Sequence, residues 1–117
     1  MAAPNIVNVA TITGKTAVLA VDTSASAIVT NSAASGKVFK VNALYVSNID
    51  GTNACDLTVD LFRSSTAYRL ASTISVPADS TLDIINKAIY LEEGDSLRLT
   101  ASATLDLEAV CSYEEIS

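Results

Sequence analysis

The sequence predicts an all-β protein: an antiparallel β-sandwich of jelly-roll or related Greek-key topology with about eight strands. Apolar and polar residues alternate with a period of two along most of the chain, which is the pattern of strands that bury one face. Turn-forming residues recur about every 8 to 12 residues, and no stretch keeps the period of about 3.6 that indicates a helix. At 117 residues, we expect one domain with a single core.

The beginning of the chain carries a weaker pattern than the rest. We expect residues 1–35 to form a strand or arm segment that packs on its own subunit or on a neighbouring one, and residues 36–117 to form the sandwich body. The elements expected in the first part are a strand over 6–12, a turn at 13–15, short strands at 17–21 and 27–29, and a loop over 31–37.

The body alternates apolar strands with turns that contain Gly, Pro, Asp or Asn. Strands are expected over residues 38–47, 55–63, 68–76, 82–85, 88–91, 97–101 and 105–113. In the turn at 48–53, Asp50-Gly51 is expected to supply a backbone position with positive φ. The side chains expected to face inward include Leu70, Ile74 and Val76 in the third of these strands, and Leu105, Leu107, Ala109, Cys111 and Tyr113 in the last.

The two cysteines, Cys55 and Cys111, both fall on the inward sets of their strands. We therefore expect two buried free thiols, because a reactive thiol needs a basic or helix-terminal setting that neither position offers. No signal peptide is recognisable, so the pair indicates no disulfide framework, and we expect synthesis in a reducing cytoplasm.

Catalytic and cofactor sites are not expected. The chain has no histidine, which excludes Ser–His–Asp and Cys–His arrangements and removes the commonest nitrogen ligand of zinc. Two carboxylate pairs, Asp56 with Asp60 and Asp106 with Glu108, alternate with apolar residues and should lie on solvent or partner faces. Acid–base catalysis would instead need one carboxyl desolvated in a pocket.

Two turns contain acidic side chains that could bind a metal ion. The turn Asp50-Gly51-Thr52-Asn53 offers too few oxygen ligands for a calcium loop and is expected to be a plain turn. Residues 92–95, Glu-Glu-Gly-Asp, are also expected to form a turn, with a cation held between loops as the alternative. The sequence therefore predicts no catalytic, cofactor-binding or metal-binding residue.

The net charge of −6 comes entirely from the last quarter of the chain. Residues 90–117 contain seven acids and only Arg98 as a base, whereas six acids and six bases balance in residues 1–89. With a pI of about 4.3 the chain has no electrostatic footprint for nucleic acid. Because Arg98 cannot pair all seven, we expect most of these acids to be solvated or to meet bases on a partner. No apolar run approaches the ~20 residues of a membrane helix.

Several short motifs carry a family resemblance. They are KVFKV at 37–41, LYVSN at 44–48 followed by Asp50-Gly51, VDL at 59–61, VPA at 76–78, YLEEGDSLR at 90–98 and SYEEI at 112–116. On these motifs the stretch from Gly36 to Ile116 resembles small β-sandwich structural proteins of tailed bacteriophages, of the marine cyanophage type. The resemblance covers about two thirds of the chain.

The resemblance implies a non-enzymatic virion protein. The leading expectation is a capsid decoration (cement) protein that binds the outer capsid lattice as a homotrimer, with itself and the major capsid protein or other virion proteins as partners. One alternative is a neck, collar or tail component, and the second is a carbohydrate- or receptor-binding module. The absence of Trp, and the mixed or inward positions expected for most Tyr, count against sugar binding. Neither nucleic acid nor membrane is an expected partner.

Overall fold

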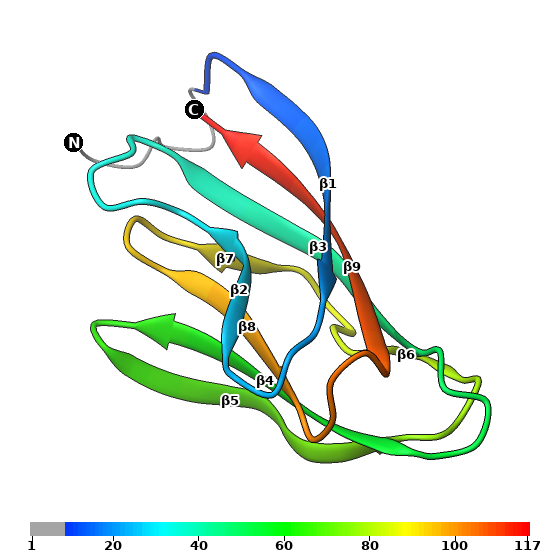
Figure 1. The fold of residues 1–117 in the computed structure, drawn as a ribbon. Coiled ribbons are helices and arrows are strands. Elements are labelled where there is room, and N and C mark those ends of the chain that lie inside the picture. The colour runs from blue at the N-terminus through cyan, green and yellow to red at the C-terminus, as the bar shows by residue number, and fades with distance from the viewer. Residues whose placement is uncertain (1–8) are drawn as a thin grey trace.

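The computed structural model describes residues 9–117, which form nine β-strands and no helix (Figure 1). The strands are β1 (Ile12–Ala20), β2 (Ser26–Thr30), β3 (Val38–Asn48), β4 (Cys55–Arg63), β5 (Thr66–Val76), β6 (Thr81–Asp83), β7 (Ile89–Leu91), β8 (Ser96–Ala101) and β9 (Leu107–Ile116). The predicted all-β class is confirmed. Residues 9–117 contain no helix long and apolar enough to cross a membrane.

Two antiparallel sheets pack face to face. Sheet I has the order β1-β9-β3-β6, with β7 pairing with β3 further along the same edge, and sheet II has the order β2-β8-β4-β5. This is the strand order of an eight-stranded jelly roll whose sixth strand is interrupted, so that β6 and β7 are its two parts. The sandwich that the sequence predicts is therefore correct, with nine strands in place of about eight.

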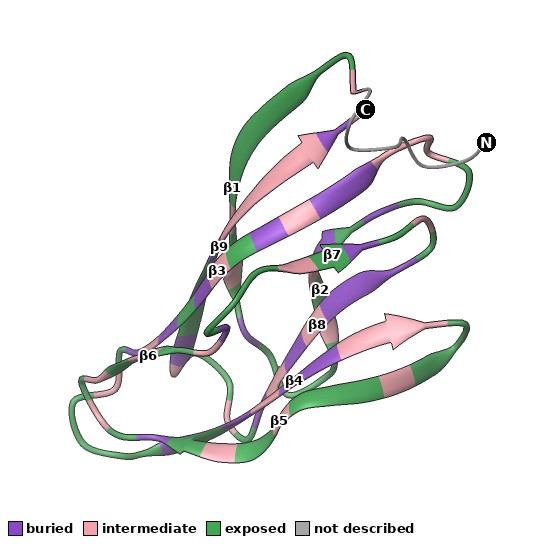
Figure 2. Cartoon of the chain, turned by 180° about the vertical axis from the view of Figure 1, so that it is seen from behind, coloured by how far each residue is buried: buried purple, intermediate pink, exposed green. Residues whose placement is uncertain are grey.

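The core lies between the inner faces of the two sheets. β3 and β8 contribute buried side chains at alternate positions, whereas β1 and β5, at one edge of each sheet, are mostly exposed (Figure 2). The largest fully buried apolar side chains are Leu44, Leu57, Leu91, Leu97, Leu99, Leu107, Val21, Val41, Val46, Val59 and Val76. Small and medium aliphatic side chains fill most of this core, and the aromatic contribution is Phe39 against Tyr113, with ring centroids 5.5 Å apart.

The predicted turn at residues 13–15 is wrong, because these residues lie inside β1. β1 pairs with β9 without interruption from Ile12 opposite Ile116 to Ala20 opposite Glu108, and a continuous ladder holds Gly14 extended despite its turn preference. Of the strand expected at 6–12, residues 6–8 lie outside the described residues, and 9–11 are not strand. Within the described residues, β1 and β2 pair with β9 and β8 of the same chain.

Two inward assignments are also wrong. Leu70 is exposed because β5 carries two register shifts against β4, one on each side of Val59, and each adds a residue to β5. Leu105 precedes β9 in a backbone conformation with φ of 66° and is 80% exposed. The turn at 48–53 is present, but Gly51 does not have the expected positive φ.

Replacing a leucine by alanine should lower the stability of the protein much more at a buried position than at an exposed one. Leu44→Ala is expected to lower the free energy of unfolding by about 2–5 kcal/mol, because it opens a cavity at a fully buried position. Leu105→Ala makes the same chemical change at the exposed position and should cost no more than about 0.5 kcal/mol. Urea unfolding of both variants measures the difference, and equal losses would contradict the placement of these two leucines.

Candidate interaction surface

Both cysteines are buried free thiols, as predicted. Cys111 lies in the middle of β9, where burial raises the pKa of its thiol to about 11. Cys55 begins β4 and lies 3.4 Å from the Ser102 hydroxyl. A buried thiol is out of reach of other molecules, so neither cysteine is a candidate nucleophile in the folded protein.

Asp60 does not lie on a solvent face as predicted. It points to the outer side of sheet II but is fully buried there, because Arg69 Nη1 and Arg98 Nε each donate a hydrogen bond of 2.9 Å to its carboxylate. The Arg98 guanidinium in turn lies 3.9 Å from the centre of the Phe62 ring. Two arginines from neighbouring strands thus cover this carboxylate and occupy both of its oxygens. Asp56, its predicted companion, is exposed.

The turn after β7 is held by a second buried carboxylate. Arg63 at the end of β4 donates from Nε to Asp95 Oδ1 over 2.8 Å and from Nη2 to Glu92 Oε2 over 2.8 Å. The Glu92 backbone N–H donates to Asp95 Oδ2 over 2.8 Å. Hydrogen bonds from Arg63, its strongest partner, lower the pKa of Asp95 although burial opposes the shift. The Arg63 guanidinium therefore lies against the carboxylates of this turn, and residues 9–117 contain no group of three His, Cys, Asp or Glu side chains that could hold a metal ion.

The same turn is tied to the loop between β2 and β3. Asn31 is fully buried and its side-chain amide donates to the carbonyls of Lys37 and Leu91 over 2.9 and 3.0 Å. The Gly36 N–H donates to Glu93 Oε2 over 3.0 Å. Two loops that are distant in the sequence thus form one hydrogen-bonded unit at this end of the sandwich, and its role is structural.

Glu115 lies between two lysines near the C terminus. Its carboxylate is 3.0 Å from Lys15 Nζ of β1 and 3.1 Å from Lys37 Nζ before β3. Burial alone would raise the pKa of Glu115, but the hydrogen bonds from the two lysines outweigh it and the pKa is lowered. The pairs join the two strands that flank β9.

The acidic quarter is thus less available to solvent or a partner than the charge count suggested. Glu92 and Asp95 form ion pairs with Arg63, and Glu115 forms ion pairs with two lysines. All three bases lie earlier in the chain than the last quarter, where Arg98 is the one base. Arg98 itself pairs with Asp60. Glu108, by contrast, is exposed on β9, while its predicted companion Asp106 precedes the strand.

The strongest candidate for contact with another molecule is an apolar row on the outer face of sheet I. Val18 of β1 pairs in register with Val110 of β9, which pairs on its other side with Tyr45 of β3. These three side chains are 74%, 40% and 45% exposed. A row that crosses three neighbouring strands forms one continuous apolar strip, unlike the singly exposed apolar residues that any protein surface carries.

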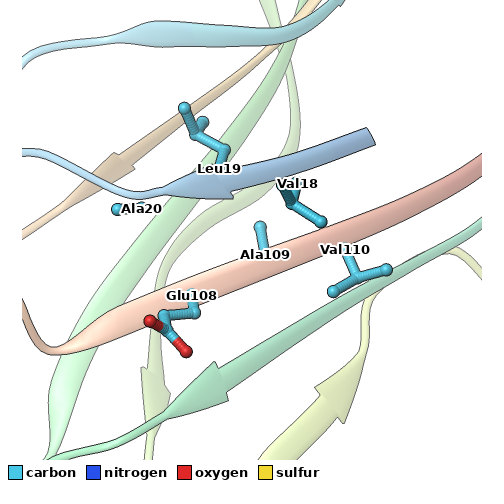
Figure 3. A pocket seen from close by; sticks show the side chains of 6 residues that line it. All are labelled: Val18, Leu19, Ala20, Glu108, Ala109 and Val110. Carbon is cyan, nitrogen blue, oxygen red and sulfur yellow. The ribbon is translucent and has the colours of Figure 1, made fainter. Parts of the chain in front are cut away.

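A shallow pocket of ≈ 260 Å³ lies beside this row, between β1 and β9 (Figure 3). Its lining residues are Val18, Leu19, Ala20, Glu108, Ala109 and Val110. The pocket carries one ionisable side chain, Glu108, and no second group to act with it. This arrangement suits an apolar side chain of a partner better than a substrate that must be polarised.

The apolar row was not predicted from the sequence. The available signal was an apolar residue at a position that alternates with the inward set, such as Val110 between Ala109 and Cys111. Only the strand register brings Val18, Val110 and Tyr45 into one row. The expectation for tyrosine was also wrong, since Tyr45, Tyr68 and Tyr90 are all exposed.

Comparison with known proteins supports the fold. No family model matches the chain, and no curated protein matches it. Among solved structures, it is similar to a chain from a structure described as "Bacillus endospore appendages form a novel family of disulfide-linked pili", with a TM-score of 0.52 and 16% sequence identity. The match covers 90% of this chain and 87% of the other. At this identity the likeness shows the shared β-sandwich fold.

The stabilising effect of the buried Asp95 carboxylate should depend on pH. Because the pKa of Asp95 is lowered in the folded state, its contribution to stability is present above the unfolded pKa of about 4 and is lost as the pH falls through the folded value. Asp95→Asn should therefore cost about 1.5–3 kcal/mol at pH 7, and the loss should shrink below about pH 4. Urea unfolding across this pH range measures it.

Glu108→Gln is the matched control, because Glu108 is exposed and forms no ion pair within residues 9–117. Its stability should stay within about 0.5 kcal/mol of the parent at both ends of the pH range. A loss for Asp95→Asn that does not depend on pH would show that packing, and not the charge on Asp95, accounts for its effect.

Proposed function

We propose that this chain is a non-enzymatic structural subunit of a virus particle, and specifically a decoration protein that stabilises the head by binding the outer capsid lattice. The observation that carries the proposal is the apolar row of Val18, Val110 and Tyr45 on the outer face of sheet I. A partner that covers this row gains up to about 1.5–3 kcal/mol for each large side chain that it removes from water. Symmetric repetition over a lattice multiplies that gain.

The composition of the row fits a protein partner. Tyr45 supplies an aromatic anchor with a polar end, and aromatic residues are enriched among those that dominate protein interfaces. Val18 and Val110 surround it with rigid, branched side chains that lose little conformational entropy on burial. The nearby pocket between β1 and β9 offers a recess for a side chain of the partner.

The ionisable groups point away from enzymatic chemistry. Asp60 and Asp95 are buried but each is neutralised by arginine, and Cys55 and Cys111 are buried thiols. The resemblance of Gly36 to Ile116 to phage structural proteins supports the virion as the location. The jelly-roll topology is compatible with this role, because the same architecture serves many viral capsid proteins as well as unrelated lectins and enzymes.

The pilus protein supports the coarser part of the proposal, a structural subunit. Its title describes disulfide-linked pili. In this chain both cysteines are buried and the pKa of Cys111 is raised to about 11, so neither thiol is placed to join subunits. If this chain assembles, it does so through non-covalent contacts, and a reducing agent should leave the assembly intact.

Sugar binding is less well supported. Two exposed tyrosines lie on the outer side of sheet I: Tyr45, and Tyr90, which pairs in register with Lys40. Tyr45 lies five residues after Lys40 along β3, or roughly 16 Å at the rise of an extended strand. Tyr68 lies on β5 in the other sheet. The three rings therefore do not form one stacking platform.

Copy number in purified particles tests the proposal. We expect the wild-type chain at hundreds of copies per particle, and Val110→Lys to reduce this by about tenfold or more, since a charge buried in an apolar contact costs at least about 1.4 kcal/mol. Leu105→Lys places the same charge at an exposed site outside the row and should assemble normally. A protein-stoichiometry gel with reductant present gives the ratio.

The same gel separates the alternatives. A copy number in the low tens that is a multiple of six or twelve would replace the decoration role with a neck or tail role. Absence of the chain from purified particles would overturn the virion assignment. Normal incorporation of Val110→Lys would show that the apolar row is not the binding surface.

A further inference from the structure

The two sheets have four edges, and three of them are irregular. β2 has a register shift between Ala27 and Val29, and β5 has two shifts on either side of the position opposite Val59. The fourth strand of sheet I is divided into β6 and β7. Bulges and interruptions of this kind prevent a sheet edge from pairing with another chain.

The edge formed by β1 has none of these protections. β1 is nine residues long and pairs with β9 in a continuous register with no shift. Among the described residues, no strand pairs with its other side. Proline is absent from β1, and Lys15 is its one charged residue.

The hydrogen bonds show which backbone groups face that free edge. Thr11 and Ser117 exchange two hydrogen bonds of 2.9 Å, N–H to carbonyl in both directions, and the Val21 N–H donates to the Leu107 carbonyl over 3.0 Å. In an antiparallel ladder such pairs alternate, so the odd-numbered residues of β1 bond to β9. The N–H and C=O groups of Ile12, Gly14, Thr16, Val18 and Ala20 consequently point toward the open edge.

Charge does not block this edge. A lysine on an edge strand ordinarily deters pairing, but Glu115 of the same chain neutralises Lys15 at 3.0 Å. The even-numbered side chains of β1 stand on the outer face of sheet I with Val110, and Ile12 and Val18 are both exposed there. The edge therefore offers unpaired backbone groups and apolar side chains without net charge of its own.

We propose that β1 pairs with β1 of a second copy of this chain, antiparallel across a twofold axis, so that two copies of sheet I become one continuous sheet. The regular edge is complementary to itself, whereas the other three edges are shifted or interrupted. In the register that places Thr16 opposite Thr16, Lys15 faces Ala17, so the two Lys15 side chains are diagonal neighbours and not directly opposite, and each is paired with Glu115 of its own chain. Ile12 then faces Ala20, and Gly14 faces Val18.

Nine residues of paired strand span roughly 30 Å, and a contact of this kind lies toward the small end of specific interfaces. The dimer is therefore expected to depend on protein concentration. It uses the edge of sheet I, and so goes beyond the proposed lattice contact, which uses the outer face. A twofold contact of this kind yields a dimer, and the trimer that the resemblance implies would require a different contact.

Cysteine cross-linking tests both the contact and its register. Thr16→Cys places thiols opposite each other across the axis at a Cα separation of about 5.5 Å, within the range for a disulfide. Val18→Cys is the matched control, because it lies on the same face of the same strand but opposite Gly14. The buried Cys55 and Cys111 do not compete for oxidant.

Under mild oxidation of the native protein, we expect Thr16→Cys to form covalent dimers about tenfold faster than Val18→Cys, since only the first pair meets the geometry of a disulfide. Light scattering should show a wild-type dimer that dissociates on dilution. Thr16→Pro removes only a backbone N–H that points to the free edge, so it should remain a folded monomer at every concentration.

Equal cross-linking of the two cysteine variants would overturn the proposed register. A wild-type protein that remains monomeric at high concentration, or a dimer that survives Thr16→Pro, would overturn the contact itself. Val110→Lys separates this contact from the lattice contact, because it should reduce incorporation into particles while leaving the Thr16→Cys cross-link intact.

Discussion

β9 is the strand on which the rest of the structure depends, because it is paired along its whole length on both sides. β1 covers one edge from Ile12 to Ala20, and β3 covers the other from Val38 to Asn48. This pairing directs Leu107, Ala109 and Cys111 into the core. It also aligns the exposed row on the outer face and leaves the far side of β1 as the one regular free edge among the described strands. The buried side chains of β9, the apolar row and the free edge of β1 thus all follow from the register of β9 with its two neighbours.

The buried polar groups complete the sandwich through ion pairs between its strands and turns. Asp60 and Asp95 are buried because arginines from adjacent strands neutralise them, and Glu115 connects the two strands beside β9 through Lys15 and Lys37. Removing one partner from such a buried pair is costly, so these residues maintain the shape of the sheets.

Much of the fold could be predicted from alternation alone. The expected strands at 38–47 and 55–63 differ from β3 and β4 by one residue at most, and both cysteines are buried as their inward positions indicated. Errors arose where a distant partner decides the outcome. Gly14 is extended because β9, about a hundred residues later, pairs with it, and Asp60 is buried because Arg69 and Arg98 close over it. Local sequence contains neither fact.

The exposure of Leu70 and the position of the apolar row also could not be predicted from local sequence. Bulges reverse the facing of a strand without any obvious signal in composition, and β5 contains two of them. The row of Val18, Val110 and Tyr45 exists only once three strands are aligned. An exposed row that depends on the register of three strands could not be found by a search for short motifs in the sequence.

One side of β1 is bonded to β9, and the other side is the one that we propose for assembly. Amide hydrogen exchange along β1 tests this arrangement most directly. In dilute protein the odd-numbered amides from Thr13 to Leu19 should be protected and the even-numbered amides from Gly14 to Ala20 should exchange rapidly; in the assembled state both sets should be protected. Equal protection of the even-numbered amides in dilute protein would show that the outer edge of β1 is already covered, and their rapid exchange after assembly would show that assembly does not use this edge.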